Sequence, residues 1–367
     1  MNSYDTIILG AGMAGLSIAR ELAKLKLRVL LLEVEEKGGK TSRAAAGILD
    51  PYTETTEETP LFRLGLKALE LYPTFLEELG EKVPSQIEYE KLGILYLAVR
   101  PEDEEFLKDR YEWQRKRGLP VERVSSEKIK KMEPAVSSRV ESGIFYPEIP
   151  KLSAEKLTDA LLNSSRSTGV EIRTGLKKVS ILLEKGKVGG VQVEGKAIES
   201  PVVVLASGCW AGLHENLGIE IKISSVRGQI LILKSNGSFR PTHILHTIRW
   251  AYIVPWPGNR LLIGSTLESN VGFENRVTSV GQKDILERVS EIYEDIKTLP
   301  METSWAGLRP YVDGGVPLIG PSRIKGLILA LGYYRSGILI SPLVGKLLGE
   351  GIVAGEFSPL LEPFHPK

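Results

Sequence analysis

The chain has 367 residues, 42% of them hydrophobic, and its 47 Lys and Arg against 46 Asp and Glu give a formal net charge of +1. This length allows two domains around a sizeable core, and the balanced charge provides no global field to attract nucleic acid or an anionic membrane. The single cysteine, Cys209, excludes an internal disulfide framework and a thiolate metal site, and it fits a reducing compartment. The longest apolar runs fall well short of the roughly 20 residues that a transmembrane helix needs, so no membrane span is expected.

The first part of the chain contains a strand, a helix and a second strand in close succession. Residues 6–9 and 28–32 are apolar runs typical of buried strands, and residues 14–24 repeat apolar side chains at helical spacing. Residues 34–46 are charged and then small, which predicts an extended loop that enters another helix. Further elements are expected downstream, namely helices at residues 61–79 and 102–117 and a strand at 93–99.

The middle of the chain changes from helical to strand periodicity. Residues 153–168 predict a helix that Ser153 can cap and Gly169 can end. After it the apolar period becomes two, which predicts a β-meander. Its strands are expected at residues 170–173, 179–183, 188–193 and 202–205. The remaining elements are strands at 229–233, 252–254, 261–264 and 327–331, a helix near 280–292 and a last helix from about 337 to 348.

The clearest chemical signal is the sequence Gly10-Ala-Gly12-Met-Ala-Gly15, which follows the first strand and opens the first helix. Gly10 permits the tight turn, Gly12 lets the backbone approach a pyrophosphate, and Gly15 permits close packing of helix on strand. The pyrophosphate would lie at the helix N-terminus, where free amide donors and the positive end of the helix dipole meet it. Glu33 ends the second strand, where a carboxylate can accept hydrogen bonds from ribose hydroxyls. The pattern predicts a dinucleotide site without distinguishing NAD from FAD.

The segment from Gly39 to Gly47 is rich in small residues that could lie along a bulky cofactor. Here the chain resembles the D-amino-acid oxidase superfamily, and within it the glycine oxidase and sarcosine oxidase branch. The resemblance continues in the family's order over nearly the whole chain. The further matching segments are Val203 to Ala211, Val226 to Gln229, Trp305 to Pro310 and Gly332 to Ile338.

The resemblance implies FAD as the cofactor. It is expected to be non-covalent, because no cysteine occurs near residues 314–320, where the sarcosine oxidase branch tethers its flavin. Gly332 and Gly337 flank a helix start that could direct amide donors at the flavin ring. The residues expected to contact FAD are Gly10, Gly12, Met13, Ala14, Gly15, Glu33, Thr41, Ser42, Arg43, Ala45, Ala46, Gly47, Val179, Ala206, Ser207, Gly208, Trp210, Gly332, Tyr334, Arg335, Ser336, Gly337 and Ile338.

The resemblance also assigns the substrate site. Arg309 matches the family's guanidinium that pairs with the substrate carboxylate, for which the planar fork of arginine is suited. Tyr252 matches a tyrosine whose hydroxyl reaches the same carboxylate, although a half-buried strand tyrosine is an equal alternative. Arg335 matches a second active-site arginine or braces the last loop. Leu267 is either an apolar wall of the pocket or a core leucine.

One position departs from the family pattern. Trp250 stands where glycine oxidases often carry a histidine, so the pocket is expected to be reshaped and glycine need not be the preferred substrate. No metal site is expected, because His214, His243, His246 and His365 lack ligand spacing and are assigned to surface or capping positions. The acidic stretch from Glu54 to Glu58 is interpreted as a solvated face.

We therefore expect an α/β enzyme with a Rossmann-type FAD-binding domain and a second substrate domain built on an antiparallel sheet. The FAD domain would comprise residues 1–82, 150–220 and 320–367, and the substrate domain residues 83–149 and 221–319. The expected reaction is oxidative deamination of a small amino acid, namely glycine, sarcosine or a D-amino acid. Hydride would pass to the flavin, the imine would hydrolyse, and oxygen would reoxidise the flavin and give hydrogen peroxide.

Two other functions fit the same sequence. One is a dye-linked dehydrogenase that oxidises proline or a D-amino acid and passes electrons to a carrier, alone or within a larger complex. The other is a flavoprotein that binds FAD without turnover, against which Arg309 and Tyr252 argue. The expected partners are thus a small amino acid and either oxygen or an electron carrier, in a cytoplasmic homo-oligomer that binds no nucleic acid.

Overall fold

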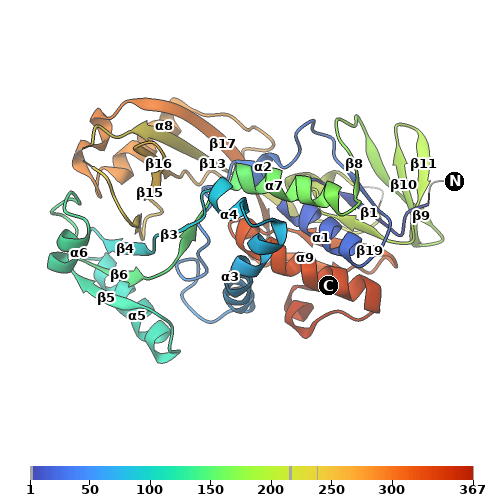
Figure 1. The fold of residues 1–367 in the computed structure, drawn as a ribbon, viewed down its shortest axis with the longest axis horizontal. Helices are drawn as coiled ribbons and strands as arrows, with labels where there is room; N and C mark the ends of the chain where they lie inside the picture. Colours follow the sequence, from blue (N-terminus) through green and yellow to red (C-terminus); the bar gives the residue numbers. More distant parts are fainter. Residues whose placement is uncertain (1–2, 215–216, 238, 367) are drawn as a thin grey trace.

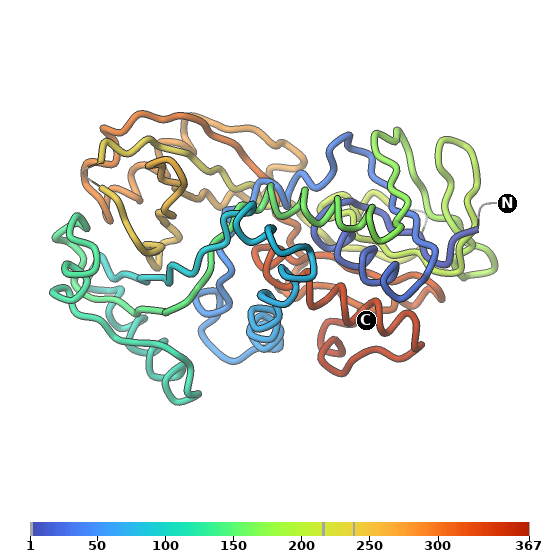
Figure 2. The backbone as a smooth tube through the Cα atoms, in the orientation of Figure 1, coloured from blue at the N-terminus to red at the C-terminus, as the bar shows by residue number. Residues whose placement is uncertain are grey.

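The computed structural model describes residues 3–214, 217–237 and 239–366, which form two lobes side by side (Figure 1). One lobe contains the amino-terminal strands and the carboxy-terminal helix, which lie next to each other although they are far apart in the chain. Figure 2 shows that the backbone enters the second lobe, returns to the first, enters the second again and ends in the first. Both lobes are therefore built from separate pieces of chain.

The first lobe is centred on a mostly parallel sheet with strand order β18-β19-β12-β1-β2-β8. Every neighbouring pair is parallel except the edge pair β18 and β19. The central strands are almost entirely apolar because helices or other strands cover both faces of the sheet, which is usual for parallel sheets. The strands are β1 (Thr6–Leu9), β2 (Val29–Leu32), β8 (Glu171–Arg173), β12 (Val203–Leu205), β18 (Leu318–Pro321) and β19 (Leu327–Leu331).

Helices pack closely on this sheet. The helix α1 (Met13–Lys24) contacts both α9 (Gly337–Ala354) and α7 (Ala154–Ser167), and α3 (Pro60–Leu79) also packs on α9. Among the described residues α9 is the helix long and apolar enough to cross a membrane, yet 61% of it is buried inside this lobe. The contacts with α1 and α3 are those of a core helix.

A small antiparallel sheet, with order β11-β10-β9, extends the first lobe. It consists of β9 (Val179–Glu184), β10 (Lys187–Val193) and β11 (Lys196–Glu199). The predicted meander is therefore wrong in its membership, because β8 and β12 pair with β2 and β1 in the parallel sheet. The sequences of such short strands do not identify the strands with which they pair.

The second lobe is built on a larger sheet with order β17-β13-β16-β15-β14-β4-β6-β5, mostly antiparallel. Its longest pairing joins the edge strand β17 to β13 and runs from Ile223 opposite Val312 to Leu233 opposite Met301. The strands are β4 (Ile94–Ala98), β5 (Glu122–Ser125), β6 (Ser142–Tyr146), β13 (Ile223–Lys234), β14 (Ile244–Thr247), β15 (Tyr252–Trp256), β16 (Arg260–Gly264) and β17 (Met301–Val312). The helices of this lobe are α5 (Asp103–Lys116), α6 (Ser126–Met132) and α8 (Ser279–Val289).

The predicted α/β class with a Rossmann-type unit is confirmed. The last helix is longer than expected and reaches Ala354, and the loop after β2 enters only the short helix α2 (Lys40–Arg43) before α3. The sequence patterns did not predict several short elements. These are α4 (Val83–Gln86), β3 (Glu90–Lys91), β7 (Pro150–Lys151), β5, β6, β11, β14 and α6.

Candidate active site

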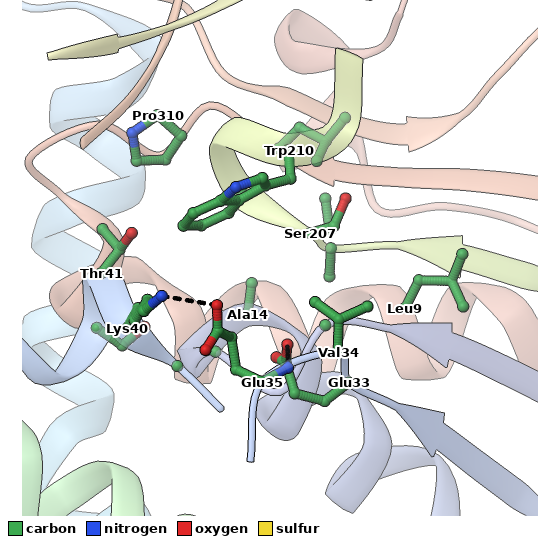
Figure 3. Close-up of a pocket in the computed structure, with 18 of the residues that line it drawn as sticks. Leu9, Ala14, Glu33, Val34, Glu35, Lys40, Thr41, Ser207, Trp210 and Pro310 are labelled. Atoms are coloured by element: carbon green, nitrogen blue, oxygen red, sulfur yellow. Dashed lines mark hydrogen bonds and ion pairs between the residues drawn. The ribbon is translucent and has the colours of Figure 1, made fainter. Parts of the chain in front are cut away.

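A cleft of about 930 Å³ runs along the carboxyl ends of β1, β2, β12 and β19. Parallel strands place these ends at one edge of the sheet, which is where ligands bind in open α/β sheets. Figure 3 shows Glu33 and the Lys40–Glu35 ion pair on one side of the cleft and Trp210 facing them. A cleft of this size and position suits a dinucleotide.

The glycine turn between β1 and α1 has the geometry that its sequence predicts. Gly10 has φ +112°, and a Cβ there would lie 2.5 Å from the carbonyl oxygen of Ala206. A Cβ on Gly15 would collide with the carbonyl of Gly10. At the start of α1 the Met13 amide donates to Ser42 Oγ at 3.0 Å, and Gly12 caps the helix without a side-chain hydrogen bond. This helix N-terminus is therefore open to an anionic group.

Glu33 lies at the end of β2 and lines the cleft. Its Oε2 accepts from the amide of Ala11 at 2.8 Å, and its Oε1 accepts from the amide of Glu35 at 3.0 Å. These bonds fix the carboxylate against the glycine turn. Each oxygen keeps a further lone pair for an outside donor such as a ribose hydroxyl.

The small-residue segment from Gly39 to Gly47, which contains α2, is hydrogen-bonded to the second lobe. Thr41 Oγ1 donates to the carbonyl of Leu308 at 2.8 Å, and the indole of Trp305 donates to the carbonyl of Ala44 at 3.0 Å. Cys209 Sγ also contacts the Leu308 carbonyl, and burial raises the pKa of this thiol to about 12. The cysteine is therefore a buried thiol.

Arg309 lies on β17, opposite Val226 of β13. Its Nη2 donates to Ser265 Oγ at 2.8 Å and its Nη1 to the carbonyl of Thr266 at 3.2 Å. No carboxylate of the described residues lies within salt-bridge distance of it, although the next residue, Pro310, lines the cleft. Burial lowers the pKa of Arg309, but a guanidinium stays protonated in proteins, so the group remains a cation.

Two strand glycines make room for this arginine and for Tyr252. A Cβ on Gly228 of β13 would lie well inside 3.0 Å of the guanidinium of Arg309, and one on Gly264 of β16 would lie 2.5 Å from the Tyr252 hydroxyl. The buried hydroxyl of Tyr252 hydrogen-bonds Ser265. Ser265 therefore links the two groups that the family resemblance assigns to one carboxylate. The sequence drew attention to neither glycine individually, nor to Ser265.

The side chains of Arg335 and Trp250 pack against each other and form a pair that we call the Trp250–Arg335 wall. The guanidinium of Arg335 stacks on the Trp250 indole at 3.9 Å from the ring centroid and pairs with Glu54 at 3.0 Å. Trp250 has φ +62°, which is a strained conformation for a bulky residue. Contacts with the surrounding structure must offset the energy that this conformation costs. Glu54 belongs to the acidic stretch that was expected to be a solvated face, and it is an exposed residue whose carboxylate pairs with Arg335.

Two further expectations need correction. Leu267 is 49% exposed, so it is not a core leucine, and its alternative role as a wall of the substrate pocket stays a prediction. His246 is not a surface residue but is 3% exposed, and it stacks between Tyr96 and Tyr252. Burial and the charge of Arg335 lower the pKa of His246 to about 3, so its ring is neutral.

Most of the residues expected to contact the cofactor line the cleft. Those that do not are Gly15, Arg43, Ala46, Gly47 and Ser336. Gly15 acts in helix packing, and Arg43 pairs with Asp159 at 2.7 Å. Lining residues that the sequence did not indicate include Glu35, Lys40, Lys177, Lys178, Gln192, Glu194, His214 and Tyr333. Within the described ranges no group of His, Cys, Asp and Glu is arranged to hold a metal ion.

Comparison with known proteins supports this geometry. The family model described as FAD dependent oxidoreductase (DAO) matches residues 5–350. The chain is 33% identical to a glycine oxidase of Geobacillus kaustophilus over 98% of its own length and 96% of that protein. The crystal structure of glycine oxidase from that organism superposes with a TM-score of 0.91 at 30% identity, covering 100% and 99% of the two chains. An iminodiacetate oxidase structure from Chelativorans sp. BNC1 gives 0.88 at 25% identity, covering 98% of each chain.

Proposed function

Since the chain belongs to the family of FAD-dependent oxidoreductases, as its resemblance to D-amino-acid oxidases predicted, we propose that it oxidises a small amino acid at the amine-bearing carbon. The overall reaction converts the amine and oxygen into an imine and hydrogen peroxide, and water then hydrolyses the imine. The similarity to a glycine oxidase and an iminodiacetate oxidase supports substrates that carry an amine and a carboxylate.

One observation carries the proposal. Arg309 is a partly buried cation whose side-chain hydrogen bonds within the described residues go to neutral acceptors, Ser265 Oγ and the Thr266 carbonyl. A desolvated guanidinium without a carboxylate partner is costly, and a substrate carboxylate would supply the missing charge through charge-assisted hydrogen bonds. The hydroxyl of Tyr252, held by the same Ser265, would donate a further hydrogen bond to that carboxylate.

The cofactor site fits FAD on its own geometry. The open N-terminus of α1 beside Gly10 accommodates the pyrophosphate, and Glu33 presents its carboxylate for the ribose hydroxyls. When bound, FAD supplies the hydride acceptor that no protein side chain provides. We propose that it is non-covalent, because Cys209 is buried and held at the Leu308 carbonyl.

The protein's own contribution is positioning. Arg309 and Tyr252 would fix the carboxylate, and the Trp250–Arg335 wall would limit the side chain that the pocket accepts. Such orientation accounts for a large part of catalysis when the reactive group belongs to a cofactor. His246 stays neutral and its Nδ1 has no hydrogen-bond partner among the described residues. We assign it no proton-transfer role.

We also propose the division of labour between the lobes. Residues 1–82, 150–220 and 320–367 would hold FAD, and residues 83–149 and 221–319 would bind the substrate. The parallel sheet with its cleft and the position of Arg309 on β17 support this division. A cytoplasmic homo-oligomer is part of the same proposal, supported by the one reduced, buried cysteine and by exposed apolar side chains at the cleft rim such as Leu213. Sedimentation of the purified protein at several concentrations would test the oligomer.

An anaerobic screen tests the function. The purified, FAD-loaded protein is mixed with glycine, sarcosine, proline and D-amino acids, and bleaching of the flavin absorbance is followed. At least one of these should bleach the flavin, and air should then restore the colour with formation of hydrogen peroxide. Bleaching without recovery in air would indicate that an electron carrier, and not oxygen, reoxidises the flavin. No bleaching by any amino acid would refute the proposed substrate class.

A further inference from the structure

The segment from Ser265 to Glu268 carries both acceptors of Arg309. Ser265 Oγ and the Thr266 carbonyl accept from the two terminal nitrogens of the guanidinium, and Ser265 also holds the Tyr252 hydroxyl. The position of this segment therefore determines how the Arg309 guanidinium is oriented towards a ligand.

Glu268 fixes the segment against β13. Its main chain exchanges two hydrogen bonds with Arg227, at 2.9 and 3.0 Å. Its Oε1 accepts from Thr266 Oγ1 at 2.5 Å and from Gln229 Nε2 at 2.7 Å, and its Oε2 accepts from Arg227 Nη2 at 2.7 Å. Thr266 Oγ1 in turn accepts from the Gln229 amide at 2.9 Å. One carboxylate thus joins the strand to the residue whose carbonyl meets Arg309.

The chemistry requires an ionised carboxylate at this position. Burial alone would raise the pKa of Glu268, but the hydrogen bonds from Arg227, Thr266 and Gln229 lower it, so the group is charged at neutral pH. The side chain of Arg227 is 7% exposed, which keeps the ion pair away from solvent screening. Three donors converge on the carboxylate, and an amide in its place would present a donor to one of them.

We propose that Glu268 is a positioning residue for the substrate-carboxylate site. Through Thr266 it holds the acceptors that orient the Arg309 fork, so its loss weakens carboxylate binding without affecting FAD. This inference rests on the proposed function, because it requires Arg309 to be the group that binds the carboxylate.

Glu274 provides a matched control. It also pairs with Arg227, at 3.4 Å, but its side chain is 51% exposed and its hydrogen bonds within the described residues reach neither Ser265 nor Thr266. Glu274→Gln removes a negative charge from the same arginine and leaves the Thr266 link intact.

The test uses acetate as a carboxylate probe for the oxidised, FAD-loaded protein. Its dissociation constant is measured from the change in flavin absorbance for the parent, Glu268→Gln, Glu274→Gln, Arg309→Ala and the double variant Glu268→Gln/Arg309→Ala. The dissociation constant for FAD is measured in parallel. We expect Glu268→Gln to weaken acetate binding about tenfold, the lower end of what loss of an outer supporting partner costs at metal sites. FAD affinity and the Glu274→Gln variant should stay close to the parent.

The double variant separates positioning from a general structural defect. If Glu268 acts through Arg309, its replacement has no further effect once Arg309 is alanine, whereas independent effects would add. Two results overturn the positioning role and leave the proposed function standing. One is that the effects of the two single variants on acetate binding add in the double variant. The other is that Glu268→Gln binds acetate as the parent does while Arg309→Ala abolishes binding. Acetate that fails to bind the parent, or binds equally to Arg309→Ala, overturns the proposed function itself. Should Glu268→Gln not fold, Thr266→Val removes the same link while the ion pair remains, and it must give the same defect.

Discussion

Replacement of Gly228 by alanine should disable the substrate site while leaving the fold intact. The new Cβ would lie well inside 3.0 Å of the Arg309 guanidinium, whereas ordinary contact begins at 3.4 Å, so the guanidinium must move by on the order of 1 Å. The moving group is the end of a flexible side chain and Gly228 lacks a positive φ, so the free energy of unfolding should change by no more than about 1 kcal/mol. A displacement of this size at a positioned group costs about a hundredfold in kcat/KM, or roughly 2.7 kcal/mol.

Stopped-flow flavin reduction without oxygen gives the substrate affinity and limiting rate of Gly228→Ala, and thermal unfolding gives its stability. Gly212→Ala is the control, because its Cβ would keep 3.5 Å from the nearest atom. We expect the loss to appear mainly as weaker substrate binding. Parent-like kinetics in Gly228→Ala would show that the guanidinium position is unimportant. They would refute the claim that Gly228 leaves the space that positions the Arg309 guanidinium.

Three further predictions concern other parts of the chain. Glu33→Ala should weaken FAD binding by about 1.5–3 kcal/mol, the range for hydrogen bonds to charged groups, and fluorescence titration of the apoprotein would reveal an unchanged affinity if the ribose lies elsewhere. Burial raises the pKa of Asp50 to about 6, so its ionisation opposes folding at neutral pH and stability is gained as pH falls from about 6 towards 4. Asp50→Asn should therefore stabilise the protein at pH 7.5 by up to about 3 kcal/mol, with little effect at pH 4, and equal shifts in melting temperature at both pH values would contradict this. Cys209, with a pKa raised to about 12, should not react with a thiol reagent at pH 8 until the protein unfolds, and rapid labelling of the folded protein would disprove its burial.

The sequence was sufficient where the signal is local. The strand, glycine turn and helix from Thr6 to Lys24 follow from apolar spacing and from the contacts that Gly10 and Gly15 allow. The helices α3 and α7 also follow from local signals, since Thr59 and Ser153 cap them through side-chain hydrogen bonds. Such elements need no knowledge of the rest of the fold.

The pairing partners of the strands and the surroundings of the Arg309 guanidinium could be identified only from the tertiary structure. The strands β8 and β12 look like members of a meander in sequence, but they pair with strands more than a hundred residues away. Gly228 and Ser265 become meaningful only when β13 and the residues after β16 are brought to β17. His246 looked like an ordinary surface histidine because its ring partners, Tyr96 and Tyr252, come from different strands.

The most direct test of the central claim compares an amino acid with the matching amine that lacks a carboxylate, for example glycine with methylamine, in the parent, Arg309→Lys and Arg309→Ala. The measured quantity is the rate of anaerobic flavin reduction with FAD saturating. The account predicts that only the amino acid reduces the parent efficiently, that Arg309→Lys is impaired because the fork is lost, and that Arg309→Ala loses about 2–5 kcal/mol and treats both compounds alike. Near-parent reduction of Arg309→Ala by the amino acid would contradict the claim and make Arg335 the next candidate for the carboxylate site.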